Sequence, residues 1–179
     1  AKIKKLLAAK DAEAKVGTVY EQGTADTSSA AFRKWFKQSK VVDADGSPQR
    51  VYHGTNAKFS KFSTKKGAQG LIWFTSDKEK ISRGESGAAG TDRIIEMYVR
   101  IEKPAGWAEY EKLTLNELEA RGYDGVILKD ADGSFDGFAF EPKQFKDVRN
   151  KGSWSEEDAR LLYQSGRNPG ATKTVLEAL

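Results

Sequence analysis

The clearest periodicity in the chain is the alternation of apolar and polar residues in RIIEMYVRIE, residues 93–102. Apolar side chains recur there at every second position, which is the period of a half-buried β-strand. LIWFTS, residues 71–76, is almost continuously apolar and predicts a strand that is buried on both faces. YDGVIL and FDGFAFEP, residues 123–128 and 135–142, predict two more strands, joined by a turn over residues 130–133.

Four stretches carry helical signals instead. In SSAAFRKWFKQSK, residues 28–40, the aromatic residues follow an i, i+3, i+4 pattern, and Ser28 or Ser29 is in place as the N-cap. Thr114 and Glu117 have capping-box spacing, which predicts a helix over 115–121 that ends at Gly122. The same spacing at 153 and 156 predicts a last helix through EEDARLLYQ, residues 156–164. A short apolar stripe also predicts a helix over residues 1–15.

These elements do not alternate strictly, so they predict an α+β fold rather than a doubly wound sheet. We expect an N-terminal helix and linker over 1–28, a core domain over 29–150 and a C-terminal helical tail over 151–179. Because the chain starts with alanine rather than methionine, we also expect it to be either cut from something longer or processed.

Composition excludes several classes of protein. With 38% hydrophobic and 31% charged residues, the chain has the balance of a globular protein. It has no apolar run long enough to cross a bilayer and no secretory signal region, so we expect no membrane partner. Zero cysteines and one histidine exclude thiolate and His-cluster metal sites, and we expect no metal. The net charge of +4 tolerates an anionic partner, although the lysines are scattered.

The single histidine, His53, stands where a predicted strand ends, in the stretch RVYHGTNAKFSKFS, residues 50–63. Gly54 follows at once and would let a flat ligand approach the backbone closely. An imidazole in this position can hydrogen-bond a ligand hydroxyl. Alternatively, the histidine is simply hydrogen-bonded within a turn.

Three stretches together resemble one known family. VYHGT, GLIWFTSD and RGYDGVILKDADGSFDGFAFEPKQFKDV occur in the order and spacing of the ADP-ribosyltransferases. The likeness is to the diphtheria-toxin and poly(ADP-ribose) polymerase branch, the H-Y-E group, and above all to transferase-like domains of phage and prophage polyvalent proteins. It covers about residues 31–150. It implies a split β-sheet core of two packed, antiparallel-rich sheets with flanking helices.

The resemblance implies NAD as co-substrate and a site that cleaves its nicotinamide–ribose bond. On this basis His53 holds the adenosine ribose, Gly54 reads the carboxamide with its backbone, and Thr55 supports the ribose. Trp73 stands where the family has a tyrosine or phenylalanine and would stack on nicotinamide. An alternative is that Trp73 is plain core of a buried strand. The implied NAD-binding set also includes Phe74, which we expect to point into the core, and Thr75.

The catalytic acid is assigned by spacing from the family pattern. The position four residues before Phe140 is Asp136, where the family has a glutamate, and this carboxylate would stabilise the oxocarbenium-like transition state. Glu141 is the alternative acid, although it lies where a strand end meets a turn. A second departure is Gly84, ten residues after Phe74, where the family commonly has another tyrosine. Loop 84–92 is rich in glycine and serine, and we expect it to be mobile.

The function implied is mono-ADP-ribosylation of a macromolecular acceptor, either a host protein or a nucleic acid. We expect a phage- or toxin-derived protein that belongs to a larger phage or prophage polyprotein and that acts in the host cytoplasm or is carried in the virion. One alternative is a degenerate transferase fold that serves as a structural or binding module of a phage particle. A tRNA 2′-phosphotransferase-like enzyme ranks last, because only Arg50 and Arg83 would serve to grip a 2′-phosphate.

Overall fold

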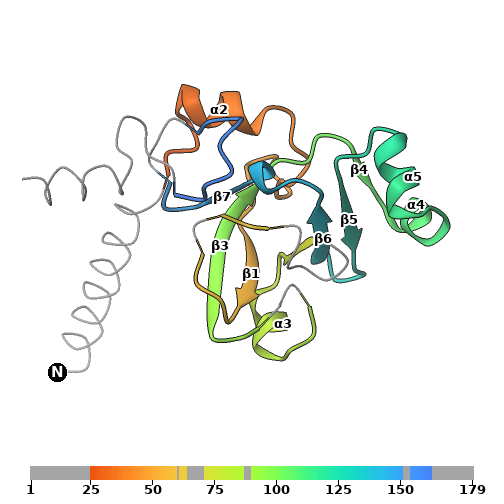
Figure 1. Cartoon of the computed structure of the whole chain (residues 1–179). Helices are drawn as coiled ribbons and strands as arrows, with labels where there is room; N and C mark the ends of the chain where they lie inside the picture. The colour runs from red at the N-terminus through yellow and green to blue at the C-terminus, as the bar shows by residue number, and fades with distance from the viewer. Residues whose placement is uncertain (1–24, 60, 64–70, 87–89, 151–153, 163–179) are drawn as a thin grey trace, which may run out of the picture.

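The backbone forms a single seven-stranded sheet with helices packed around it (Figure 1). The structure is a computed structural model, and it describes residues 25–59, 61–63, 71–86, 90–150 and 154–162. The strands are β1 Val51–Thr55, β2 Ile72–Thr75, β3 Arg93–Val99, β4 Pro104–Ala105, β5 Gly125–Lys129, β6 Phe135–Ala139 and β7 Phe145–Asp147. The helices are α2 Ala30–Phe36, α3 Lys78–Ser82, α4 Trp107–Lys112, α5 Leu115–Ala120 and the 3₁₀ turn η2 Pro142–Gln144.

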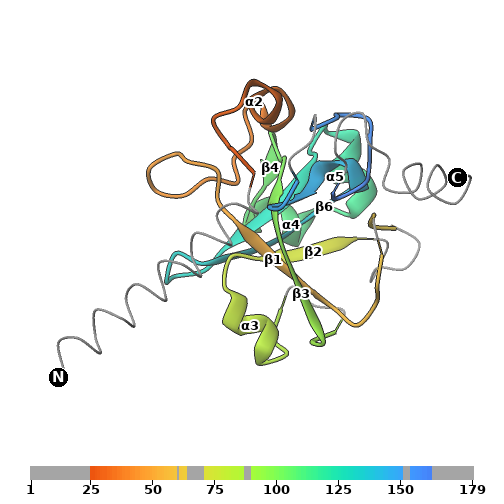
Figure 2. The ribbon, with the colours of Figure 1, turned by 90° about the vertical axis from the view of Figure 1, so that its left-hand side faces the viewer.

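The sheet is nearly divided in two. Its strand order is β4-β5-β6-β2-β1-β3-β7, and β1 pairs with β3, and β5 with β6, over five residues each. Between β1 and β2 the register contains one pair only, Tyr52 with Thr75. Figure 2 shows β2 running across the view while β1 and β3 run obliquely, so the sheet bends at this seam. The predicted α+β, ADP-ribosyltransferase-like fold is confirmed, with the two half-sheets joined into one curled sheet.

Three clusters of buried side chains stabilise this arrangement. The central cluster lies on one face of the sheet and includes Phe74 and Met97. The α2 cluster packs Phe32, Trp35 and Phe36 of the helix against the other elements at its end of the molecule. The α4–α5 cluster covers β5 and β6 at the opposite end, as Figure 1 shows. Within the described residues, no helix is both long and apolar enough to span a membrane.

Local sequence signals placed several element boundaries correctly. The Ser29 hydroxyl accepts the N–H of Phe32 at 3.1 Å and is therefore the N-cap of α2. Thr114 and Glu117 form the expected capping box of α5. Gly122 ends that helix with φ +82°, a left-handed conformation that favours glycine. The alternating stretch becomes β3, with Ile95, Met97 and Val99 buried in the central cluster.

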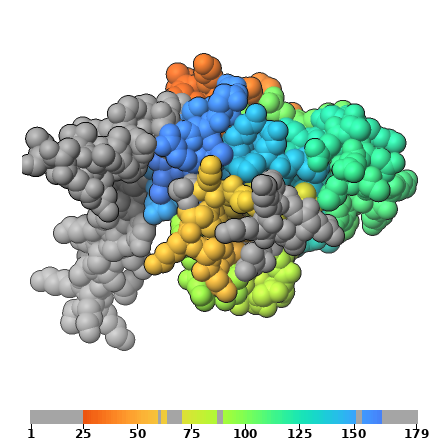
Figure 3. All heavy atoms as spheres, viewed as in Figure 1, coloured from red at the N-terminus to blue at the C-terminus, as the bar shows by residue number. Residues whose placement is uncertain are grey.

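The helix predicted over residues 156–164 is wrong across its described part. Residues 154–162 run as an irregular strap, and two apolar side chains of this strap enter different clusters. Trp154 packs into the α2 cluster, and Leu161 packs into the central cluster. A bridge between Lys61 and Arg160 holds the strap against the chain that follows β1, and Figure 3 shows the two segments side by side. The predicted helix over 1–15 and the rest of the tail lie outside the described residues.

Lys146 of β7 holds the same strap from beneath. Its side chain is fully buried, and its Nζ donates hydrogen bonds to the carbonyls of Asp158 and Arg160. Removing an ammonium group from water disfavours its charged form, so burial lowers the pKa of Lys146 to about 8. Both hydrogen bonds persist whether Lys146 is charged or neutral, because a neutral amine still donates.

The depressed pKa predicts that stability rises with pH in the alkaline range. Between about pH 8 and pH 10.5, the unfolded chain keeps the Lys146 proton that the folded chain has lost. The free energy of unfolding should therefore increase across this window, by on the order of 3 kcal/mol from this group. Urea unfolding at a series of pH values measures the slope, and Lys146→Met should remove it. An equal slope in the variant would contradict the assignment.

Candidate active site

His53 lies on the seam between the two half-sheets. Its Nδ1 is 2.6 Å from the carbonyl oxygen of Trp73, and a carbonyl only accepts, so Nδ1–H is the donor. Because the register of β1 and β2 contains one pair only, the carbonyl of Trp73 on β2 receives its hydrogen bond from the His53 side chain rather than from a backbone N–H group of β1. The imidazole also meets the ring of Phe62 edge-on, with 4.9 Å between ring centroids. The histidine therefore links the two half-sheets.

The second ring nitrogen of His53 is not bonded within the described part of the chain. Burial lowers the pKa of His53 from its usual value, although the Trp73 hydrogen bond opposes this, and so favours the neutral ring. With the proton on Nδ1, Nε2 is a hydrogen-bond acceptor. Within the described part of the chain, Nε2 has no hydrogen-bond partner, and the residue keeps 8% of its surface exposed. A ligand hydroxyl is a suitable donor to this nitrogen.

Gly54 and Thr55 complete β1 and are both buried. The Thr55 hydroxyl accepts the N–H of Ala57 at 3.0 Å and so shapes the turn that leaves the strand. The next residue, Asn56, was missed by sequence reasoning. Its side-chain oxygen accepts the N–H groups of Thr91 and Asp92 at 2.8 and 3.1 Å. Asn56 thereby anchors the end of loop 84–92 beside the HGT motif, whereas residues 87–89 of the loop lie outside the described residues.

The two aromatic residues of β2 point to opposite faces of the sheet. Phe74 is fully buried in the central cluster, on the face shared with His53. Trp73 faces the other way and stacks obliquely on Phe138 at 4.7 Å within the α4–α5 cluster. Trp73 is only half-buried, so part of its ring is accessible. It combines a packing role with an exposed aromatic surface.

Asp136 lies on β6 directly opposite Thr75 of β2, and its side chain is 20% exposed. Its Oδ2 is 3.5 Å from the Nζ of Lys80 on α3, and this lysine is also 2.5 Å from Asp130. The hydrogen bond to Asp130 raises the pKa of Lys80, and the charge of Asp136 adds to it. The other oxygen, Oδ1, is buried without a hydrogen-bond partner among the described residues. A buried carboxylate oxygen in this state is uncommon and marks an acceptor left for another group.

Lys80 was not predicted from the sequence. The one available signal is its place in the first turn of the helix after β2, because Asp77 caps that helix by accepting the N–H of Glu79. Glu141, the alternative acid, lies beyond the end of β6 at the start of η2. Its carboxylate is exposed and 3.5 Å from Lys143, and it does not join the cluster around Asp136. The geometry thus separates the two candidate acids.

Gly84 has a structural reason to be glycine. It follows α3 with φ +70°, and its N–H donates to the carbonyl of Ile81 while the N–H of Glu85 donates to that of Lys80. These two bonds are the Schellman motif, which requires a left-handed residue at this position. A side chain added at Gly84 would meet no atom within 4 Å. The position that holds an aromatic ring in related transferases here ends a helix.

Replacing Gly84 with alanine should therefore destabilise the fold through the backbone alone. We expect a loss of about 1 kcal/mol, the cost of placing a Cβ in the left-handed region. Ser82→Ala, in the last turn of the same helix, is the matched control and should be neutral or slightly stabilising. Urea unfolding of both variants provides the comparison. Equal stability of Gly84→Ala and the wild type would contradict this, because it would show that a residue with a Cβ adopts the left-handed conformation at position 84 without cost.

Comparison with known families adds an independent observation. Residues 43–113 match the model of a family described as ADP-ribosyltransferase in polyvalent proteins. Over these residues the chain is similar to the ADP-ribosyltransferase domains of polyvalent proteins. The matched part runs from the turn before β1 to the end of α4 and includes His53, Trp73 and Lys80, while Asp136 lies beyond it. No curated protein and no solved structure matches the chain.

Proposed function

We propose that this domain is a mono-ADP-ribosyltransferase that cleaves the nicotinamide–ribose bond of NAD and transfers ADP-ribose to a macromolecular acceptor. The observation that carries the proposal is the family match across the HGT strand and β2. Three suitable groups lie on the strands around this seam, one on the face of His53 and two on the opposite face. They are the free Nε2 of His53, the accessible part of the Trp73 ring and the unpartnered oxygen of Asp136.

The arrangement suits a reaction in which positive charge develops on a sugar carbon. When nicotinamide departs, the ribose becomes oxocarbenium-like, and a carboxylate near its 2′-hydroxyl favours that charge. Asp136 offers the carboxylate, and its Oδ1 lacks the donor that a hydroxyl would supply. His53 and Asp136 stand on opposite faces of the pleat, so the substrate would lie across the seam where β1 and β2 diverge.

Lys80 gives Asp136 freedom to engage a substrate. The lysine holds two carboxylates, and the contact with Asp130 at 2.5 Å is the shorter by 1 Å. If Asp136 turns toward a ribose hydroxyl, Lys80 keeps its closer partner and is not left as an unpaired buried charge. In the resting site, Lys80 also holds the carboxylate in place.

A second candidate function is a transferase fold without activity, used as a binding or structural module of a phage particle. Two observations favour it. The unpartnered oxygen of Asp136 is shielded from solvent, and the helix end at Gly84 provides no second ring to close a nicotinamide slot. The phage origin, the larger polyprotein and the location in host cytoplasm or virion belong to this proposal and to the first one equally.

Incubation of the protein with labelled NAD and a host-cell lysate tests the proposal. We expect release of free nicotinamide and transfer of label to protein or to nucleic acid, which protease and nuclease digestion distinguish. Label that appears only as free ADP-ribose would indicate NAD hydrolysis rather than transfer. If wild-type protein releases no more nicotinamide than the lysate alone, the inactive module is the better description.

A further inference from the structure

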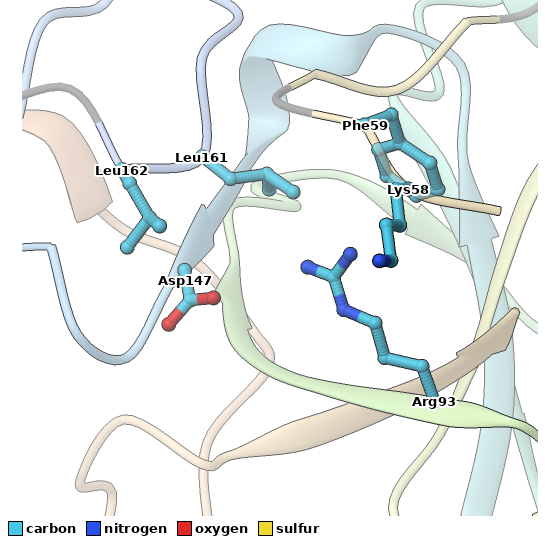
Figure 4. A pocket seen from close by; sticks show the side chains of 6 residues that line it. All are labelled: Lys58, Phe59, Arg93, Asp147, Leu161 and Leu162. Atoms are coloured by element: carbon cyan, nitrogen blue, oxygen red, sulfur yellow. The ribbon is translucent and has the colours of Figure 1, made fainter. Parts of the chain in front are cut away.

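A pocket of about 580 Å³ opens on the face of the sheet that carries His53. It is lined by side chains from three parts of the chain: Lys58 and Phe59 after β1, Arg93 at the start of β3, and Asp147, Leu161 and Leu162 from β7 and the strap. Figure 4 shows the ends of Lys58 and Arg93 close together and pointing into the opening. The pocket thus presents two cations beside an apolar wall.

The two cations have no carboxylate of their own. In the described part of the chain, neither Lys58 nor Arg93 takes part in an ion pair, and the guanidinium carbon of Arg93 lies 6.0 Å from the centre of the Phe59 ring. Bringing like charges together is unfavourable unless an anion joins them. The one acid in the lining, Asp147, is already bound by Arg149 through two hydrogen bonds of 2.9 and 2.7 Å. Among the described residues, the two positive charges of the pocket therefore have no anion that neutralises them.

The shape of the donors indicates which anion is suitable. An arginine fork and a lysine ammonium together match the several oxygens of a phosphate better than the two of a carboxylate. Phe59, Leu161 and Leu162 supply apolar surface for a ring attached to that phosphate. The class of ligand with both parts is a nucleotide.

We propose that this pocket binds the phosphate of a nucleotide through Lys58 and Arg93. Its position connects it to the seam: Arg93 pairs with Thr55 across β1 and β3, and Phe59 contacts Phe62, which contacts His53. The phosphate belongs either to the adenylate half of NAD itself or to a separate nucleotide. The proposal does not require the transferase activity, because binding is measured without turnover.

Calorimetric titration of the whole chain with 5′-AMP tests this proposal, with adenosine as the ligand that lacks the phosphate. We expect Lys58→Gln and Arg93→Gln each to weaken AMP binding about tenfold, as the loss of one charge-assisted contact would. Arg93→Lys should fall between, because it keeps the charge and loses the fork. Lys112→Gln, an exposed charge removal on α4, is the control and should bind AMP like wild type.

The outcomes separate the proposal from its alternatives. Lys58 is exposed, so its substitution leaves folding intact even if Arg93→Gln unfolds. Displacement of AMP by NAD would identify the NAD adenylate as the source of the phosphate, whereas simultaneous binding of both would identify a second nucleotide. AMP binding that is equal in wild type and Lys58→Gln, or adenosine binding as tight as that of AMP, would overturn the proposal.

Discussion

Substitution of Asp136 by asparagine should lower NAD cleavage at least about 100-fold, because it removes the charge that the proposed mechanism uses to stabilise a developing cation. The amide keeps the shape of the side chain, and Lys80 keeps Asp130 as its closer partner. The original side chain is partly exposed and has one unpartnered oxygen, so little stabilising interaction is lost. We expect the melting temperature to stay within a few degrees of wild type.

Glu141→Gln is the matched control for this experiment. Its carboxylate is exposed at the start of η2, and among the described residues it pairs only with Lys143. Nicotinamide release measured at saturating NAD should be unchanged in this variant. Normal turnover by Asp136→Asn together with loss in Glu141→Gln would place the catalytic acid at the other position.

Gly137→Ala should be among the most destabilising single changes in the domain. A Cβ at this position would lie 2.3 Å from the carbonyl oxygen of Val126 and 2.8 Å from the ring of Phe74. Neither neighbour can yield easily, because one is backbone of β5 and the other is fully buried. We expect a loss of about 3 kcal/mol in unfolding free energy as β5 and β6 are forced apart.

The control for Gly137 is Gly106→Ala, where the nearest atom to an added Cβ is 3.6 Å away. That substitution should cost less than about 1 kcal/mol. Chemical denaturation of both variants tests the pair. Because Gly137 adjoins Asp136, the first variant should also lose NAD cleavage at temperatures where it is still folded. A stable Gly137→Ala protein would show that β6 has room to move.

The sequence predicted the strands and caps well because these depend on neighbours in the chain. The alternation over residues 93–102 predicted a strand, and the spacing of Thr114 and Glu117 predicted the start of a helix. Both signals depend on local geometry, and both predictions were confirmed. The helix over 156–164 failed because Trp154 and Leu161 are held by two clusters formed elsewhere in the chain. Burial of those side chains outweighs the capping signal.

The site was harder to predict than the fold, since it depends on register. The sequence placed the HGT and IWFT motifs on strands, and the structure shows that β1 and β2 are neighbours. It could not show that β1 and β2 would share a single backbone pair, so that the His53 side chain bonds the Trp73 carbonyl. Nor could it show that Trp73 and His53 would point to opposite faces of the sheet. The approach of Lys80 to Asp136, 56 residues later, is likewise invisible without the paired strands. The roles of these residues in NAD cleavage stay predictions.

The strap over residues 154–162 also has a consequence for how the chain acquires its structure. Trp154 completes a cluster begun by Phe32, and Leu161 completes one that contains Val41 and Val51. More than one hundred residues separate the members of each set, so these contacts close very large loops. Such topology slows folding. On a ribosome, the α2 cluster cannot be completed until residue 154 has left the exit tunnel, and the central cluster not until residue 161 has. The half-sheets made earlier must wait with apolar surface uncovered.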